Sequence, residues 1–146
     1  MPELLTTTDL QQPIAVTANY MLLPIEAGFN WGDCFAPVSV GQWYLVVFRC
    51  KHRADADEEL LTQMDVAAFA AASSVSGFLH YFAGVPCATG ECLSFCLWDN
   101  ATSARAGGAH PDHRKAMEIG VRHYEYYRLE RYAIHKNSEA LTFAAL

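Results

Sequence analysis

The chain has 146 residues, a length that suits one domain with a buried core, and 52% of these residues are hydrophobic. Its formal charge of −6 at pH 7 and the mixing of basic with acidic residues argue against a nucleic-acid or membrane-surface protein, because both need clustered Lys and Arg. The sequence lacks a run of about 18 apolar residues and a signal-peptide pattern, so a cytoplasmic location is expected.

The cysteine pattern is typical of a protein from a reducing compartment. The five cysteines are odd in number, and three lie in apolar runs, where a free thiol packs as a small hydrophobic group. Cys92 and Cys96 cannot form a disulfide, because four residues of extended strand separate them by roughly 13 Å. Cys87 and Cys92 flank a turn and could approach each other.

Residues 1–40 are expected to form an extension of the domain. This segment holds four of the six prolines and few helix signals, and it predicts one strand, at 14–22. Its residues Phe29, Trp31 and Phe35 are too apolar for a free tail. We therefore expect the extension to pack on its own domain or on a partner subunit.

From residue 41 onward, strand and helix signals follow one another. A strand is predicted at 42–51, which is rich in aromatic and β-branched residues, and a helix at 55–74, which has an acidic start and an apolar stripe. The turn-rich VPCATG joins strands at 77–84 and 91–99 into a hairpin. A short helix is expected at 101–106, the main helix begins at Pro111, and the fourth strand is 127–134.

This order of elements predicts an α+β fold of the ferredoxin-like type. The unit βαββαβ forms a four-stranded antiparallel sheet with two helices on one face. The domain spans 41–135, and 136–146 is a C-terminal tail. Because residues 43–48 are apolar at both alternating positions, neither sheet face can be left in water, and dimerisation through the sheets is expected.

The element order and several stretches resemble the dimeric α/β-barrel superfamily, specifically antibiotic biosynthesis monooxygenase-type proteins. These stretches are GQWYLVVFRCKHR, GFLHYFAG, ECLSFCLWDN, HPDHRKAMEIGVRHYEYY and RLERY, within residues 41–134. The resemblance implies a homodimer with a small-molecule pocket between each sheet and its helices. The activities that it implies are diverse, from oxidation of aromatic polyketides or quinols without metal or flavin to haem degradation, and some members have no demonstrated activity.

Haem is the secondary alternative under this resemblance. Haem-degrading members use a helix His together with an Asn and a Trp. This chain has Trp43, Trp98 and several histidines, but no Asn can be placed at the matching position. The predicted cofactor is therefore none, with haem as the alternative.

The spacing H-x-x-H at His110 and His113 raises the question of a metal site. If Pro111 is the first helical residue, His110 lies at the N-cap and the pair allows only loose coordination. His123 lies roughly 15 Å further along the helix axis, so it cannot supply a third ligand. No Cys or acidic pair lies at a useful spacing, and we predict no metal.

His113 is the leading candidate for a catalytic base. It begins a helical stripe with Met117, Gly120, Val121 and Tyr124, which predicts that it faces a cavity in the core. The helix dipole and burial both disfavour the charged imidazole, so the neutral ring could take a proton. The alternative is a core histidine that is hydrogen-bonded to a backbone carbonyl.

Tyr124 and His80 are the other catalytic candidates. Tyr124 could donate a hydrogen bond to a phenolate or carbonyl oxygen, or could be an ordinary core residue. Strand alternation allows only one of His80 and Tyr81 to face the pocket, and the sequence leaves open which one. Either face of the strand at 91–99 could line the pocket, the polar face if the apolar one makes the dimer.

The resemblance leads us to predict a homodimeric small-molecule enzyme. It would abstract a proton from an aromatic or polyketide-like substrate and then oxygenate it without a cofactor. His113 or His80 would remove the proton, and Tyr124 would hold the resulting anion. The residues expected to enclose the substrate are Trp43, Trp98, Met117 and Phe82. The alternative is a non-catalytic ligand-binding or structural dimer whose histidines only satisfy the core.

Overall fold

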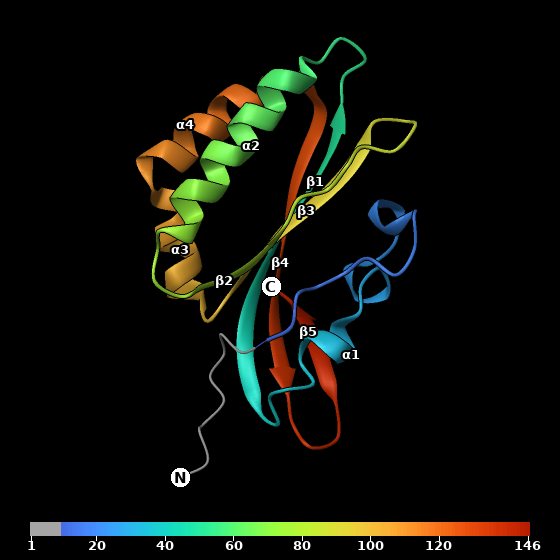
Figure 1. Ribbon diagram of the computed structural model, residues 1–146, viewed down its shortest axis with the longest axis vertical. Coiled ribbons are helices and arrows are strands. Elements are labelled where there is room, and N and C mark those ends of the chain that lie inside the picture. Colours follow the sequence, from blue (N-terminus) through green and yellow to red (C-terminus); the bar gives the residue numbers. More distant parts are fainter. Residues whose placement is uncertain (1–9) are drawn as a thin grey trace.

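One antiparallel sheet forms the centre of the molecule. The computed structural model describes residues 10–146 and arranges five strands in the order β2-β3-β1-β4-β5 (Figure 1). The strands are β1 (Gly41–His52), β2 (Phe78–Phe82), β3 (Glu91–Trp98), β4 (Tyr124–Lys136) and β5 (Leu141–Ala145). All neighbouring strands are antiparallel, as the ferredoxin-like prediction requires.

Helices cover one face of the sheet and N-terminal segments lie over the other (Figure 1). The helices are α2 (Glu58–Ser73), α3 (Ala101–Ala109) and α4 (Pro111–Gly120). The N-terminal elements are η2 (Tyr20–Leu22), η3 (Ile25–Ala27) and α1 (Trp31–Cys34). The predicted α+β class and the order β1-α2-β2-β3-α4-β4 are confirmed. Within residues 10–146, no helix is long and apolar enough to cross a membrane.

Local sequence signals set the starts of the two long helices. Asp57 caps α2 by accepting a hydrogen bond from the Leu60 amide at 3.0 Å. His110 caps α4, because its Nδ1 accepts from the Asp112 amide at 3.2 Å and Pro111 follows as the first helical residue. The prediction that His110 lies at the N-cap of this helix is confirmed.

Two boundaries in the C-terminal part differ from the prediction. The main helix, whose stripe is predicted to reach Tyr124, ends at Gly120 and passes through η4 (Val121–His123) into β4. The tyrosines that follow pair with β1, where His52 lies opposite Tyr124, so pairing with a central strand overrides the helical pattern. The predicted tail 136–146 contains β5, which extends the sheet beside β4.

Residues 10–40 form an arm that lies on the sheet face opposite the helices (Figure 1). The predicted strand at 14–22 is wrong: this segment makes one isolated bridge, Ala15 with Phe29, and then turns into η2. The arm runs across the face of the sheet and does not join an edge, so its backbone has no ladder of partners to pair with.

A large apolar core fills the space between the arm and the sheet. Trp31 packs on Phe95 of β3 and Phe143 of β5, with ring centroids 5.2 and 5.3 Å apart. The other fully buried members include Ile25, Phe35, Leu45, Val47, Leu97 and Ile134. The chain itself covers the apolar face for which the sequence predicts a partner subunit. That reason for expecting a dimer is therefore wrong.

A buried arginine ties the arm to the sheet. Arg49 of β1 pairs with Glu130 of β4 at 2.8 Å. The same guanidinium donates to the backbone carbonyls of Met21 at 3.0 Å and Leu23 at 2.8 Å. A charge buried in an apolar core needs such partners, and here they come from both layers. The arm is therefore held by polar contacts as well as by apolar packing.

Candidate functional site

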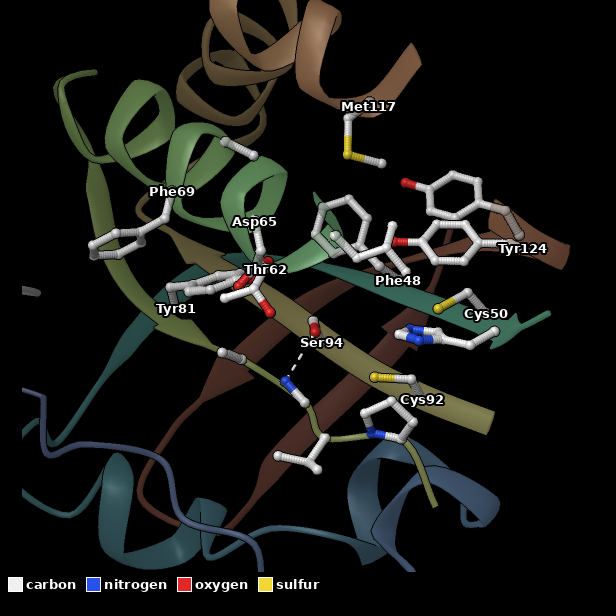
Figure 2. A pocket seen from close by; sticks show the side chains of 18 of the residues that line it. Phe48, Cys50, Thr62, Asp65, Phe69, Tyr81, Cys92, Ser94, Met117 and Tyr124 are labelled. Atoms are coloured by element: carbon white, nitrogen blue, oxygen red, sulfur yellow. Dashed lines mark hydrogen bonds between the residues drawn. The ribbon is translucent and has the colours of Figure 1, made fainter. Parts of the chain in front are cut away.

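A cavity of about 300 Å³ lies between the helices and the sheet (Figure 2). Its floor is the polar side of β1 and β3, its roof comes from α2 and α4, and β2 and β4 form its sides. Ser94 and Cys96 of β3 face it, whereas Phe95 and Leu97 face the arm. The polar side of the third strand thus lines the cavity because the apolar side is occupied by the arm.

His113 and Met117 reach the cavity from α4, one turn apart. His113 is half-buried, and burial, with a smaller contribution from repulsion by His110, lowers the pKa of its imidazole below the ordinary value. The ring is therefore neutral at pH 7 and able to accept a proton. The predicted position of His113 facing a cavity agrees with the structure, while its catalytic role stays a prediction.

Two tyrosines of β4 form an aromatic side of the cavity. Tyr124 and Tyr127 stack with their ring centroids 6.0 Å apart and their planes at 11°. Tyr124 therefore reaches the cavity, but from a strand and not from the helical stripe on which the sequence places it. Burial raises the pKa of both phenols, so both remain hydrogen-bond donors at neutral pH.

An aspartate and a tyrosine make a polar pair in the wall that the sequence reasoning missed. The Tyr81 hydroxyl of β2 donates to the Asp65 carboxylate of α2, and both side chains point into the cavity (Figure 2). Burial raises the pKa of Asp65, although the hydrogen bond from Tyr81 opposes this shift. A sequence signal existed, because Asp65 is the one acidic residue of α2 beyond its first turn, within an alanine-rich stretch.

Three of the predicted site residues lie on the opposite face of the sheet, under the arm. The ring of His80 is 3.1 Å from the carbonyl of Leu10, Trp43 packs on Phe35 at 4.5 Å, and Phe82 belongs to the same core. None of the three lines the cavity. Strand alternation is the physical reason, because Tyr81 takes the cavity side of β2 and leaves His80 on the other.

Trp98 lies on the helix side of the sheet but outside the cavity. It is buried against Ala104 and packs edge-on to Phe78 at 5.4 Å. It lines an adjoining groove, which shares His113 and Met117 with the cavity. Phe78 is on this side because the register shifts between Phe78 and residue 80, which breaks the simple alternation that the sequence predicts.

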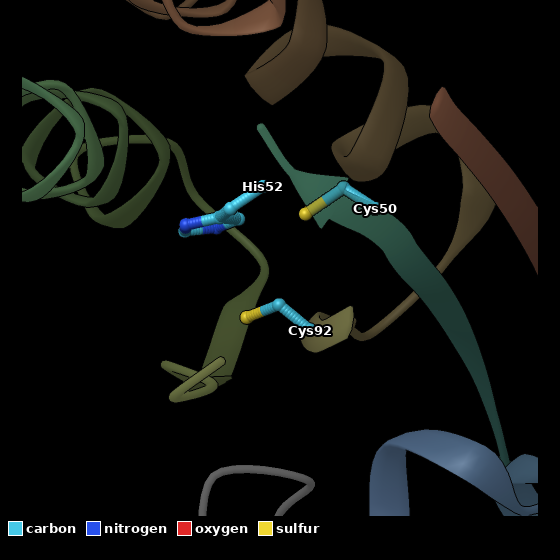
Figure 3. Close-up of side chains that lie close together, drawn as sticks. All are labelled: Cys50, His52 and Cys92. Carbon is cyan, nitrogen blue, oxygen red and sulfur yellow. The ribbon is translucent and has the colours of Figure 1, made fainter. Parts of the chain in front are cut away.

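A cluster of two thiols and an imidazole occupies one end of the cavity. Cys50, His52 and Cys92 each offer a ligand atom within 4.8 Å of the other two (Figure 3). The sequence prediction of no metal considered spacing along the chain and missed this set, which forms only when β1 and β3 pair. These are the residues of the described chain that are able to hold a metal ion.

The chain matches the model of the PB2B2.08-like family over residues 1–145 and belongs to that family. No curated protein sequence matches it. Among solved structures it is similar to a dimeric ferredoxin-like protein of unknown function from Thermobifida fusca, with a TM-score of 0.52 and 18% identity over 64% of this chain and 92% of that one. The ferredoxin-like fold predicted for this chain is therefore confirmed.

Two other similar structures are named as an oxygenase and a monooxygenase. SnoaB, a cofactor-independent oxygenase from Streptomyces nogalater, has a TM-score of 0.51 and 11% identity over 62% of this chain and 89% of its own. A protein of Nitrosomonas europaea, named as a candidate antibiotic biosynthesis monooxygenase, has a TM-score of 0.55 and 10% identity over 63% and 89%. At such identities the likeness confirms the fold and leaves the activity to the site.

Proposed function

We propose that this protein is a small-molecule enzyme that oxygenates an aromatic or polyketide-like substrate without flavin or haem. The observation that carries the proposal is one cavity that combines half-buried His113, with its lowered pKa, and the Tyr124 hydroxyl. A neutral imidazole that faces a cavity is suited to general-base catalysis. The similar structure of SnoaB, which is described as a cofactor-independent oxygenase, supports the choice of oxygenation as the reaction class.

The proposed chemistry needs only a base and oxygen. His113 takes a proton from an acidic CH₂ group of the substrate, and the carbanion gives its electrons to O₂, so that a C–O bond forms. His113 returns the proton to the resulting peroxide, and loss of water leaves a ketone. The CH₂ group and O₂ thus become C=O and H₂O, and the substrate carbon supplies all the electrons.

The other polar groups of the cavity have supporting roles in this proposal. Tyr124 and Tyr127, kept protonated by burial, donate hydrogen bonds to the oxyanion of the substrate. The hydrogen bond between Tyr81 and Asp65 fixes the wall on the other side, and we regard this pair as positioning residues. Met117 and the tyrosine rings exclude water from the carbanion.

Oxygen uptake tests the proposal directly. The purified protein is incubated with anthrone-type polycyclic ketones that carry an acidic CH₂ group, and oxygen consumption and the product spectrum are recorded for the wild type, His113→Ala and His80→Ala. His80 is the matched control, because it is a half-buried histidine on the other face of the sheet. Uptake that is lost only in His113→Ala is expected. Equal uptake in both variants contradicts the assigned base, and a Soret band with added haemin favours the haem alternative.

We propose that the protein assembles as a homodimer, and the description of the Thermobifida fusca protein as dimeric supports this proposal. Because the arm covers the free face of the sheet, the contact would include the outer surface of the arm. Ile14, Val16 and Leu22 support this choice, since these apolar side chains are between 57% and 59% exposed. Light scattering of the wild type and of Leu22→Lys tests it: a dimer that dissociates in the variant is expected, and a monomeric wild type contradicts it.

A further inference from the structure

Two thiols and an imidazole meet at one end of the cavity, where β1 and β3 pair. Cys50 and Cys92 lie directly opposite each other, and His52 follows Cys50 by two residues. Both cysteines are 7% exposed, and the His52 side chain is 11% exposed. From the position of their ligand atoms within 4.8 Å of one another (Figure 3), we propose that these three residues bind one Zn²⁺ ion.

The separations suit a tetrahedral site. With Zn–S bonds of about 2.3 Å and a Zn–N bond of about 2.0–2.1 Å, neighbouring ligand atoms lie about 3.5–3.8 Å apart in a tetrahedron. Atoms that lie within 4.8 Å must therefore approach by about 1 Å at most. Small rotations of the cysteine side chains supply such a movement without displacing the paired strands.

Glu58 is the hydrogen-bond partner that would orient the His52 imidazole toward the metal. Both of its carboxylate oxygens lie 3.0 Å from Nδ1 of His52. A metal-bound histidine usually donates its other ring N–H to a carboxylate, which fixes the tautomer and makes the coordinating nitrogen more basic. With Nδ1 bound to Glu58, Nε2 is left to coordinate the metal. Glu58 is the first residue of α2, so the helix start holds this carboxylate in place.

Both cysteines are free thiols, so both are available as metal ligands. Zinc binding displaces protons from thiol ligands. Two thiolates cancel the charge of Zn²⁺, so the metal brings little net charge into this buried place.

The fourth coordination position would face the cavity, because all three ligands are part of its wall. Zinc sites with three protein ligands and one open position are of the catalytic type and bind water or a substrate oxygen. Zn²⁺ is not redox-active, so it leaves the electron balance of the proposed oxygenation unchanged. The zinc site does not rest on that proposed function and is tested without any substrate.

Metal titration of the full chain tests the inference. The protein is reduced, stripped of metal and titrated with Zn²⁺ against a chromophoric chelator, and in parallel with Co²⁺ as a spectroscopic probe. The variants are Cys50→Ala, Cys92→Ala and Glu58→Gln. Cys96→Ala is the matched control, because Cys96 is a third buried thiol in the same cavity wall. Circular dichroism verifies that each variant is folded.

One equivalent of Zn²⁺ per chain and a thiolate-to-cobalt charge-transfer band are expected for the wild type and Cys96→Ala. Both signals should be absent in Cys50→Ala and Cys92→Ala, and Glu58→Gln should weaken zinc binding by about 10- to 100-fold. Less than one equivalent in the reduced wild type, or equal binding by Cys92→Ala and Cys96→Ala, would overturn the inference. The wild-type cobalt spectrum decides the question even if a cysteine variant does not fold.

Discussion

Removal of the Trp31 side chain should destabilise the whole domain, because this residue joins the arm to the sheet. Its ring packs on Phe95 at 5.2 Å, Phe143 at 5.3 Å and Phe35 at 6.2 Å, and its Nε1 donates to the Ile25 carbonyl at 2.8 Å. Truncation of a buried Trp to Ala costs about 3–5 kcal/mol, and domains are stable by about 5–15 kcal/mol. Trp31→Ala should therefore remove roughly a fifth or more of the free energy of unfolding.

Urea unfolding followed by far-ultraviolet circular dichroism measures this change, since loss of a Trp complicates fluorescence. Val40→Ala is the control within the same arm, because Val40 is 68% exposed and its truncation should cost less than about 0.5 kcal/mol. A Trp31→Ala variant that is as stable as Val40→Ala would refute the integral role of the arm. The arm would then contribute little to the free energy of unfolding, and the folded domain would consist of the sheet and its helices.

Three further perturbations have defined outcomes. The folded-state pKa of His113 is lowered, so stability should fall as the pH drops below about 6.5, and His113→Gln should weaken this pH dependence in urea unfolding. Gly90→Ala should lower the midpoint of thermal unfolding, because φ is +88° and a Cβ would lie 2.7 Å from the His52 carbonyl oxygen. Tyr81→Phe should cost about 1–3 kcal/mol in urea unfolding, because the Asp65 carboxyl loses its donor.

The parts of the fold that could be predicted are those with local causes. Asp57 and His110 cap helices through contacts within three residues, and the aromatic and β-branched run of β1 favours a strand wherever it is placed. The end of α4 could not be predicted, because the segment around Tyr124 has a pattern that suits a helix or a strand. Pairing with His52 across β1, a contact between distant segments, decides between them.

In the candidate site, too, the residues that could be predicted are those placed by local patterns, and the others depend on contacts between distant segments. His113 could be predicted because one helical stripe places it, whereas the choice between His80 and Tyr81 depends on which sheet face the arm covers. The thiol cluster could not be predicted from the sequence, because Cys50 and Cys92 are far apart along the chain and meet only through the register of β1 and β3. Spacing within one segment detects a metal motif only when the ligands share that segment.

Hydrogen exchange at the substrate carbon tests the central claim most directly, because proton abstraction by His113 precedes any use of oxygen. A substrate identified by oxygen uptake is incubated in D₂O without oxygen, and deuterium entering its CH₂ group is followed by NMR. Exchange by the wild type and His80→Ala should exceed that by His113→Ala by about 10²- to 10⁴-fold, the usual contribution of a general base. Equal exchange rates in the wild type and His113→Ala would contradict the assignment of His113 as the base.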